Sequence, residues 1–293
     1  MRPGVSNYIW GTALLLAVLL TVVYFQANQH PSEQLAARAR RQQVAGELRL
    51  ALASAAEAEK SAVLAITDQE SEKFAAEARA ATAAAEQRRA ELSDLLKNGS
   101  QREQELFAEF SASFTKLQQI DKEVLDLAVR NTNLKASALL FGPAAEAIRQ
   151  MDAALSRVMA KSSSPRELRL AAAAQAGALR IQALLPPHVA EENEQKEDAL
   201  EAQMAQQDAE VTKDLRDLGL QAAEAAASYA RFSEVRAQII KLSRENTNIR
   251  SLALSLNEKR AADVACQASL AALEAEIAAE PVAGVREHIV RPR

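Results

Sequence analysis

The sequence predicts an all-α protein, in which an N-terminal transmembrane helix precedes a long antiparallel four-helix bundle built from two repeated helical hairpins. About a fifth of the 293 residues are alanine, aromatic residues make up 4%, and there are only 8 Gly and 8 Pro. This composition is typical of long, closely packed helices. Apolar residues recur every three or four positions, for example at Phe110, Phe114, Leu117, Ile120 and Val124, as expected for the buried face of a bundle helix.

A repeat supports the two hairpins. The stretch NTNLKASAL, residues 131–139, returns 115 positions later as NTNIRSLAL, residues 246–254. Apolar residues before the motif align without gaps at the same offset. The helices that carry the motif are therefore expected to be copies, and each is the second helix of a hairpin.

The membrane helix is predicted from Tyr8–Phe25, a stretch of 18 residues without a charge. As a helix it is about 27 Å long, close to the roughly 30 Å of a bilayer core. Tyr8, Trp10 and Tyr24 stand near its ends, where an aromatic belt meets the interface. The competing interpretation is a cleaved signal peptide, but the apolar stretch is longer than usual and its end is a poor cleavage site.

We expect residues 1–29 to form a cytoplasmic tail and an uncleaved anchor. Basic residues occur both before the apolar stretch, at Arg2, and after it, from Arg38 to Arg41, so that the positive-inside rule is ambiguous. The favoured topology is a single pass through the inner (cytoplasmic) membrane, with the helical body outside the cytoplasm, in the periplasm.

The first hairpin is predicted over residues 30–161. Its first helix runs from Ser32 to about Lys97, and Asn98-Gly99-Ser100 then ends it. Ser100 and Glu103 form a capping box for the second helix, which continues to Lys161.

The second hairpin is predicted over residues 162–280, followed by a flexible tail at 281–293. Ser164, Pro165 and Glu167 supply an N-cap, an N1 proline and an acid in the first turn of its first helix. Pro186-Pro187 is expected to interrupt that helix, and Gly219 to mark the next turn.

The motif places polar residues on the apolar face of each copy. Asn131 lies between Leu127 and Leu134 in the apolar repeat, and Asn246 occupies the same place in the second copy. A buried amide without partners costs about 1–3 kcal/mol. The two Asn side chains are therefore expected to share one layer and to bond to each other, to the neighbouring Thr, to water or to a ligand.

Two interpretations of this polar layer remain open. It can fix the register of the helices, or it can line a pocket for a small molecule, with flanking basic residues reaching an anionic ligand. The candidate ligand-binding residues are Asn131, Thr132, Asn133, Lys135, Asn246, Thr247, Asn248 and Arg250.

Three stretches resemble the four-helix-bundle sensor region of methyl-accepting chemotaxis receptors. They are IDKEVLDLAVRNTNLKASALLFGPAAEAI, LLPPHVAEENEQKEDALEAQM and IIKLSRENTNIRSLALSLNEKR. The similarity covers about residues 30–280. It implies an extracytoplasmic ligand-sensing bundle, often a homodimer, that passes a small helix displacement through the membrane.

The chain departs from these receptors after Glu280, where PVAGVREHIVRPR contains no second apolar span and no methylated signalling hairpin. We therefore expect a sensor that acts through a signalling partner protein. The alternative is an envelope coiled-coil spacer or scaffold that senses nothing.

Other classes of function have no support in the sequence. No P-loop, dinucleotide-binding glycine pattern or Gly-x-Ser-x-Gly elbow occurs, and no enzyme activity or cofactor is expected. The three histidines are far apart, so no metal site is predicted, and His188 is interpreted as a turn residue that starts a helix. Cys266, the single cysteine, is expected in a helix interior. The net charge of −4 without a basic stripe argues against nucleic-acid binding.

Overall fold

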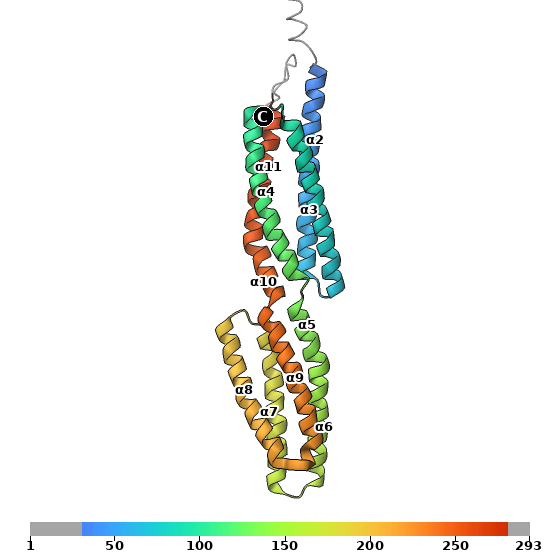
Figure 1. The fold of residues 1–293 in the computed structure, drawn as a ribbon, viewed down its shortest axis with the longest axis vertical. Coiled ribbons are helices and arrows are strands. Elements are labelled where there is room, and N and C mark those ends of the chain that lie inside the picture. Colours follow the sequence, from blue (N-terminus) through green and yellow to red (C-terminus); the bar gives the residue numbers. More distant parts are fainter. Residues whose placement is uncertain (1–30, 281–293) are drawn as a thin grey trace, which may run out of the picture. The chain divides into compact units, whose positions relative to one another are not determined.

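The computed structural model describes residues 31–280, which are helical almost throughout and form two compact units. The all-α helical fold is therefore confirmed. In chain order the elements are α2 (Pro31–Leu64), α3 (Asp68–Leu96), α4 (Gln101–Ala128), α5 (Thr132–Leu139), the π-helix η1 (Leu140–Ala144), α6 (Ala145–Lys161), α7 (Pro165–Ala190), α8 (Glu194–Leu218), the 3₁₀-helix η2 (Gly219–Ala222), α9 (Ala223–Glu245), α10 (Thr247–Leu254), the π-helix η3 (Ser255–Lys259) and α11 (Arg260–Ala279) (Figure 1).

No helix within residues 31–280 is both long and apolar enough to cross a membrane. The predicted anchor, Tyr8–Phe25 with Tyr8, Trp10 and Tyr24, lies outside the described residues, as does the predicted tail at 281–293.

The prediction of one uninterrupted helix from Ser32 to Lys97 is wrong. Helix α2 ends at Leu64 and α3 begins at Asp68. Thr67 starts the new helix, because its Oγ1 accepts a hydrogen bond from Glu70 N at 3.1 Å. A Thr followed three residues later by Glu is a helix-start signal, and it outweighs the continuous alanine pattern on either side.

The predicted interruption at Pro186-Pro187 is also wrong, since α7 continues through both prolines to Ala190. Leu185 and Val189 are buried on either side of the prolines, so packing holds this last turn in helical form. The break comes at residues 191–193, where Asn193 Oδ1 accepts from Lys196 N at 3.1 Å and caps α8.

Two predicted caps are confirmed. Ser100 and Glu103 form the capping box of α4, with Glu103 N bonded to Ser100 Oγ at 3.1 Å and Ser100 N bonded to Glu103 Oε2 at 2.8 Å. Ser164 caps α7 by accepting from Glu167 N at 3.4 Å.

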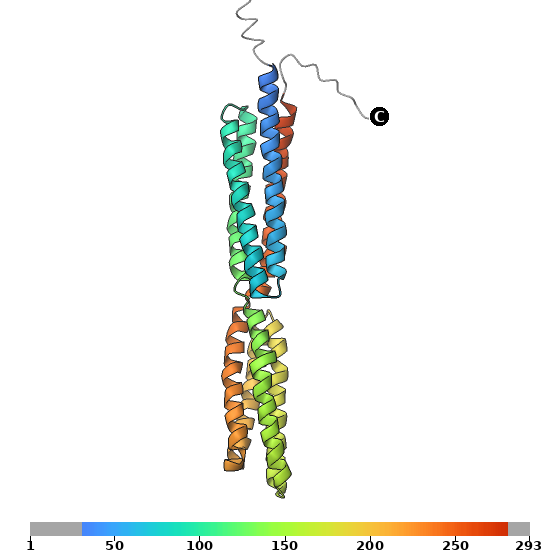
Figure 2. The ribbon, with the colours of Figure 1, turned by 90° about the vertical axis from the view of Figure 1, so that its right-hand side faces the viewer.

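The first unit consists of residues 31–54, 81–116 and 262–280 within the described range. Segments of α2, α3, α4 and α11 lie side by side in it (Figures 1 and 2). Its core includes Leu48, Leu92, Phe110 and Leu270. Cys266 is buried there as expected, and burial raises the pKa of its thiol to about 12, so the thiol stays protonated and unreactive.

The second unit consists of residues 55–80 and 117–261. Its largest core lies among α6, α7, α8 and α9, which run side by side in Figures 1 and 2, and includes Leu155, Ile181 and Phe232. Gly177 of α7 permits close approach of α8, because a Cβ at this position would lie 2.5 Å from Val211 Cγ2. Both predicted hairpins contribute residues to each unit.

The two copies of the sequence repeat have the same backbone interruptions. Asn131 and Asn246 interrupt the helices 115 residues apart, and the π-helices η1 and η3 also begin 115 residues apart, at Leu140 and Ser255. The prediction that the motif lies inside a continuous helix is therefore wrong, but the spacing of the two copies is kept.

One buried ion pair distinguishes the two copies in the second unit. Lys259 of η3 occupies the place that Ala144 has in η1, and its Nζ lies 3.1 Å from Glu59 Oε2 of α2. Both side chains are at most 4% exposed, and Glu59 Oε1 has no partner. Removing one member of such a pair leaves a buried charge uncompensated.

We predict that Glu59→Leu or Lys259→Met alone destabilises the protein by about 3–5 kcal/mol, and that the double variant is much milder than the sum. Urea unfolding of the four proteins measures this coupling. The exposed pair Arg79–Asp126, 3.0 Å apart, is the control, because its loss should cost less than about 1 kcal/mol. If loss of the Glu59–Lys259 pair costs no more than loss of the Arg79–Asp126 pair, then Glu59 and Lys259 do not form a buried ion pair.

Candidate functional site

The candidate site is the place where the two Asn-Thr-Asn motifs meet in the second unit. Asn131 and Asn246 precede α5 and α10, and both adopt the left-handed conformation, with φ of 51°. Asn enters this region more readily than most residues other than Gly. The backbone break therefore explains the Asn at the start of each motif.

The helix starts exchange their caps. Neither Asn caps its own helix through its side chain. Thr132 N instead donates to Thr247 Oγ1 at 3.2 Å, and Thr247 N donates to Thr132 Oγ1 at 3.0 Å. One residue later, Asn133 N donates to Asn248 Oδ1 at 3.1 Å, and Asn248 N donates to Asn133 Oδ1 at 3.2 Å. Each helix thus satisfies the free N–H groups of the other. We call these six residues, 131–133 and 246–248, the crossover.

The outer amides of the crossover pair in the same reciprocal way. Asn248 Nδ2 donates to Asn131 Oδ1 at 2.9 Å, and Asn133 Nδ2 donates to Asn246 Oδ1 at 2.8 Å. The expected polar layer is thus present, but Asn131 and Asn246 bond to the third Asn of the opposite motif. Asn131 Nδ2 is buried without a partner.

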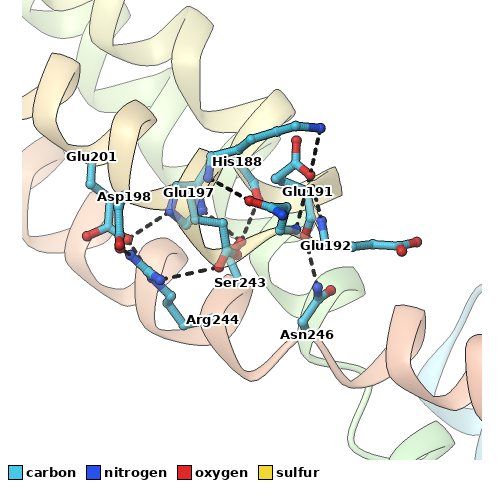
Figure 3. Close-up of polar contacts among 11 residues, drawn as sticks. His188, Glu191, Glu192, Glu197, Asp198, Glu201, Ser243, Arg244 and Asn246 are labelled. Carbon is cyan, nitrogen blue, oxygen red and sulfur yellow. Dashed lines mark hydrogen bonds and ion pairs between the residues drawn. The ribbon is translucent and has the colours of Figure 1, made fainter.

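The crossover also holds the end of α7. Asn133 Nδ2 donates to Val189 O, and Asn246 Nδ2 donates to Glu191 O, both at 2.9 Å. Figure 3 shows Asn246 beside this end of α7. The last carbonyls of a helix lack partners within it, so these amides fix where α7 stops.

The two basic candidates lie outside the paired layer. Lys135 is exposed, donates to Arg130 O at 2.8 Å and lies 3.7 Å from Asp68 Oδ2. Arg250, its counterpart in the repeat, lines a surface hollow of about 330 Å³ on α4 and α10. The hollow is lined by Gln119, Lys122, Glu123, Asp126, Leu127, Arg130 and Arg250.

A second polar cluster adjoins the crossover and was not predicted. His188 lies in the last turn of α7 and is fully buried, so its interpretation as a residue that starts a helix is wrong. Its Nδ1 lies 2.8 Å from Ser243 Oγ of α9, and its Nε2 lies 2.9 Å from Glu201 Oε1 of α8. The apolar residues around His188 were a signal for burial, but its partners are far away in sequence.

Arg244 of α9 gathers the acids of α8 in this cluster. Its Nε lies 2.7 Å from Glu201 Oε1, its Nη1 lies 3.4 Å from Glu197 Oε2, and Nη2 contacts Asp198 (Figure 3). Burial raises the pKa of Glu197 above its usual value. Burial also opposes ionisation of Glu201, but hydrogen bonds from Arg244 and His188 outweigh it and lower the pKa of that carboxyl.

The exchanged caps lead to a prediction about the two Thr residues. Thr132→Ala and Thr247→Ala should each destabilise the protein by about 1 kcal/mol, because each leaves one N–H of the opposite helix uncapped. The double variant should cost less than the sum, since the hydroxyls also contact each other at 3.2 Å. Chemical unfolding measures the cycle. Thr→Ser at either position keeps the oxygen and is the control, and strict additivity of the Ala variants would show that the hydroxyls do not meet.

The left-handed break leads to a second prediction. At residue 131, Gly should be tolerated better than Ala by about 1 kcal/mol, because only the side chain with a Cβ is strained there. The same comparison at Ala205, an exposed position inside α8, should have the opposite sign, since Gly costs about 1 kcal/mol relative to Ala in a helix. Thermal unfolding compares the variants. The same sign at both positions would mean that residue 131 is ordinary helix.

Comparison with known proteins adds one finding about the family. No curated protein matches the chain. Residues 45–164 match the family described as the four helix bundle sensory module for signal transduction. This stretch begins within α2, includes α3, α4, α5 and η1, and ends just after α6. The resemblance predicted from the sequence is thus confirmed: residues 45–164 carry the pattern of a sensory four-helix-bundle module of chemotaxis receptors.

Proposed function

We propose that this protein is a membrane-anchored, chemoreceptor-like sensor, whose helical body binds a small ligand and acts through a partner protein. The family match over residues 45–164 carries this proposal. The apolar stretch Tyr8–Phe25 supports anchoring in a membrane. The proposal includes a helical body outside the cytoplasm and a homodimer as the working form, as the resemblance to chemotaxis receptors implies.

The hollow beside the crossover is the proposed ligand site. Arg130, Arg250 and Lys122 supply three cationic groups, and Glu123 and Asp126 supply two acids. Arg donates paired hydrogen bonds to a carboxylate, while the acids favour an ammonium group. The lining therefore suits a small carboxylate or amino acid. Arg250 was predicted for this role, whereas Arg130 and Lys122 were not.

A ligand in the hollow can influence the crossover, because two of the lining residues are close to it in sequence. Arg250 lies three residues beyond Thr247, whose hydroxyl and N–H belong to the exchanged caps. Arg130 immediately precedes Asn131. A ligand that draws these two Arg side chains together acts on the start of α10 and on the end of α4, on either side of the crossover.

The alternative function is a structural spacer. Mutual pairing favours it, because most polar groups of the crossover bond to the opposite motif. In this interpretation the motif fixes the register of the helices and the protein responds to no ligand.

A thermal-shift experiment on the full chain separates the two functions. A panel of mono- and dicarboxylates and amino acids should include a compound that raises the unfolding temperature in a concentration-dependent way. Arg250→Gln and Arg130→Gln should weaken that response about tenfold or more, because a hydrogen bond to a charged group contributes about 1.5–3 kcal/mol.

Lys135→Gln is the matched control. Lys135 is the repeat counterpart of Arg250 but does not line the hollow, so the response should be unchanged. If no compound of the panel raises the unfolding temperature, the structural spacer is the favoured function. If Arg250→Gln, Arg130→Gln and Lys135→Gln all reduce the thermal shift equally, the ligand binds outside the hollow.

A further inference from the structure

The cluster around His188 contains more hydrogen-bond contacts than a neutral imidazole can satisfy. Ser243 Oγ lies 2.9 Å from His188 O and 2.8 Å from His188 Nδ1, while His188 Nε2 lies 2.9 Å from Glu201 Oε1 (Figure 3). A carbonyl and a carboxylate only accept hydrogen bonds, and a Ser hydroxyl has a single proton to donate.

Counting protons fixes the state that satisfies all three contacts. If Ser243 donates to His188 O, then Nδ1 must donate to Ser243 Oγ. If Glu201 is ionised, then Nε2 must donate to it. Both ring nitrogens then carry protons, so the imidazole is positively charged. With Glu201 ionised, a neutral ring must give up one of the three contacts.

The position of the ring also favours the positive charge. His188 lies in the last turn of α7, where the helix dipole stabilises a cation. Ionised Glu201 faces it directly from α8, and Glu197 and Glu194 of α8 lie near enough to interact electrostatically within the same cluster. From α9 the opposing group is Arg244, which is already bonded to Glu201, Glu197 and Asp198. Helix α5 contributes uncharged Asn133 at Val189 O.

Glu197 provides a second proton-binding group in the cluster. Its carboxyl is about 5% exposed, and its Oε1 is buried without a partner. Burial raises the pKa of this group, so that ionising it in the folded protein is costly. Its contribution to stability is complete below its ordinary pKa and falls as the pH rises through the raised value.

We propose that His188, Glu197 and Glu201 form a proton-operated latch, which fastens the end of α7 to α8 and α9 when protons are bound and loosens as the pH rises. Histidine is the side chain that proteins use for changes of charge between about pH 5 and 8, so the experiments below cover that range. Glu201 sets the lower end of the pH range in which the latch is fastened. Because its pKa is lowered, its contribution to the stability of the folded protein is lost only as the pH falls below the usual carboxyl range.

The latch is connected to the crossover through the end of α7. Val189 O and Glu191 O, one and three residues beyond His188, accept the amides of Asn133 and Asn246. Loosening this end removes acceptors from two crossover side chains. The protein thereby gains a response to pH that is separate from the proposed carboxylate site and does not depend on it.

Nuclear magnetic resonance of the unmodified full chain tests the protonation state. With ¹⁵N-labelled histidine, His188 should show both ring nitrogens protonated at pH 5.5 and should lose one proton by pH 8. His30 and His288, the other histidines of the chain, serve as internal references. A His188 ring that carries a single proton throughout this range would overturn the proposal.

Hydrogen exchange and one variant test the latch itself. After correction for intrinsic rates, the backbone N–H groups of Thr247 and Asn248 should exchange about tenfold faster at pH 8 than at pH 5.5, which corresponds to about 1.4 kcal/mol. His188→Gln keeps a donor for Glu201 but does not titrate in this range, so it should abolish the change.

His288→Gln is the control and should retain the change. The proposal would also be overturned if exchange of the Thr247 and Asn248 N–H groups depended equally on pH in the His188→Gln variant. If His188→Gln does not fold, the titration and exchange of the unmodified chain decide alone.

Discussion

A helix start leaves backbone N–H groups without partners, and the rest of the second unit depends on how this protein satisfies them. Two helices break at equivalent left-handed Asn residues, and each new helix is capped by side chains from the other. The side-chain amides of Asn133 and Asn246 donate to Val189 O and Glu191 O at the end of α7. A single arrangement therefore sets where α5 and α10 begin, where α7 ends, and how the His188 cluster meets the motif.

Much of the fold was accessible from local sequence, because helix caps and the repeat are local signals. Ser100, Glu103 and Ser164 behave as predicted. The α2–α3 break was missed because alanine-rich helical sequence lies on both sides of it, although Thr67 and Glu70 carried a capping signal. The residues of the crossover were predicted, but their pairing was not. Helical periodicity assumes a continuous helix, and only a left-handed break allows one motif to cap the other.

The candidate sites lie where the two copies differ. Lys135 and Arg250 are counterparts, yet only Arg250 lines the hollow. Ala144 and Lys259 are counterparts, and only Lys259 requires a buried acid. Pattern matching between copies reveals what they share, so it could not find these differences. His188 was missed for a related reason, because its partners Glu201 and Ser243 come from helices that only the fold brings together.

Reciprocal capping also makes the crossover suited to switching as one element. Each Thr is both donor and acceptor for the other, so loss of one contact weakens its twin. Four backbone N–H groups are capped across the motifs. At about 1 kcal/mol each their joint release costs at most about 4 kcal/mol, because the two Thr caps are coupled. A single effector would need about a thousandfold preference for one state to offset that cost. Effectors that act on different edges of the crossover can divide this requirement. Protons held by the His188 cluster favour the capped state, so their loss as the pH rises lowers the cost that a ligand held by Arg130 and Arg250 must offset. The two sites are thereby coupled through the crossover.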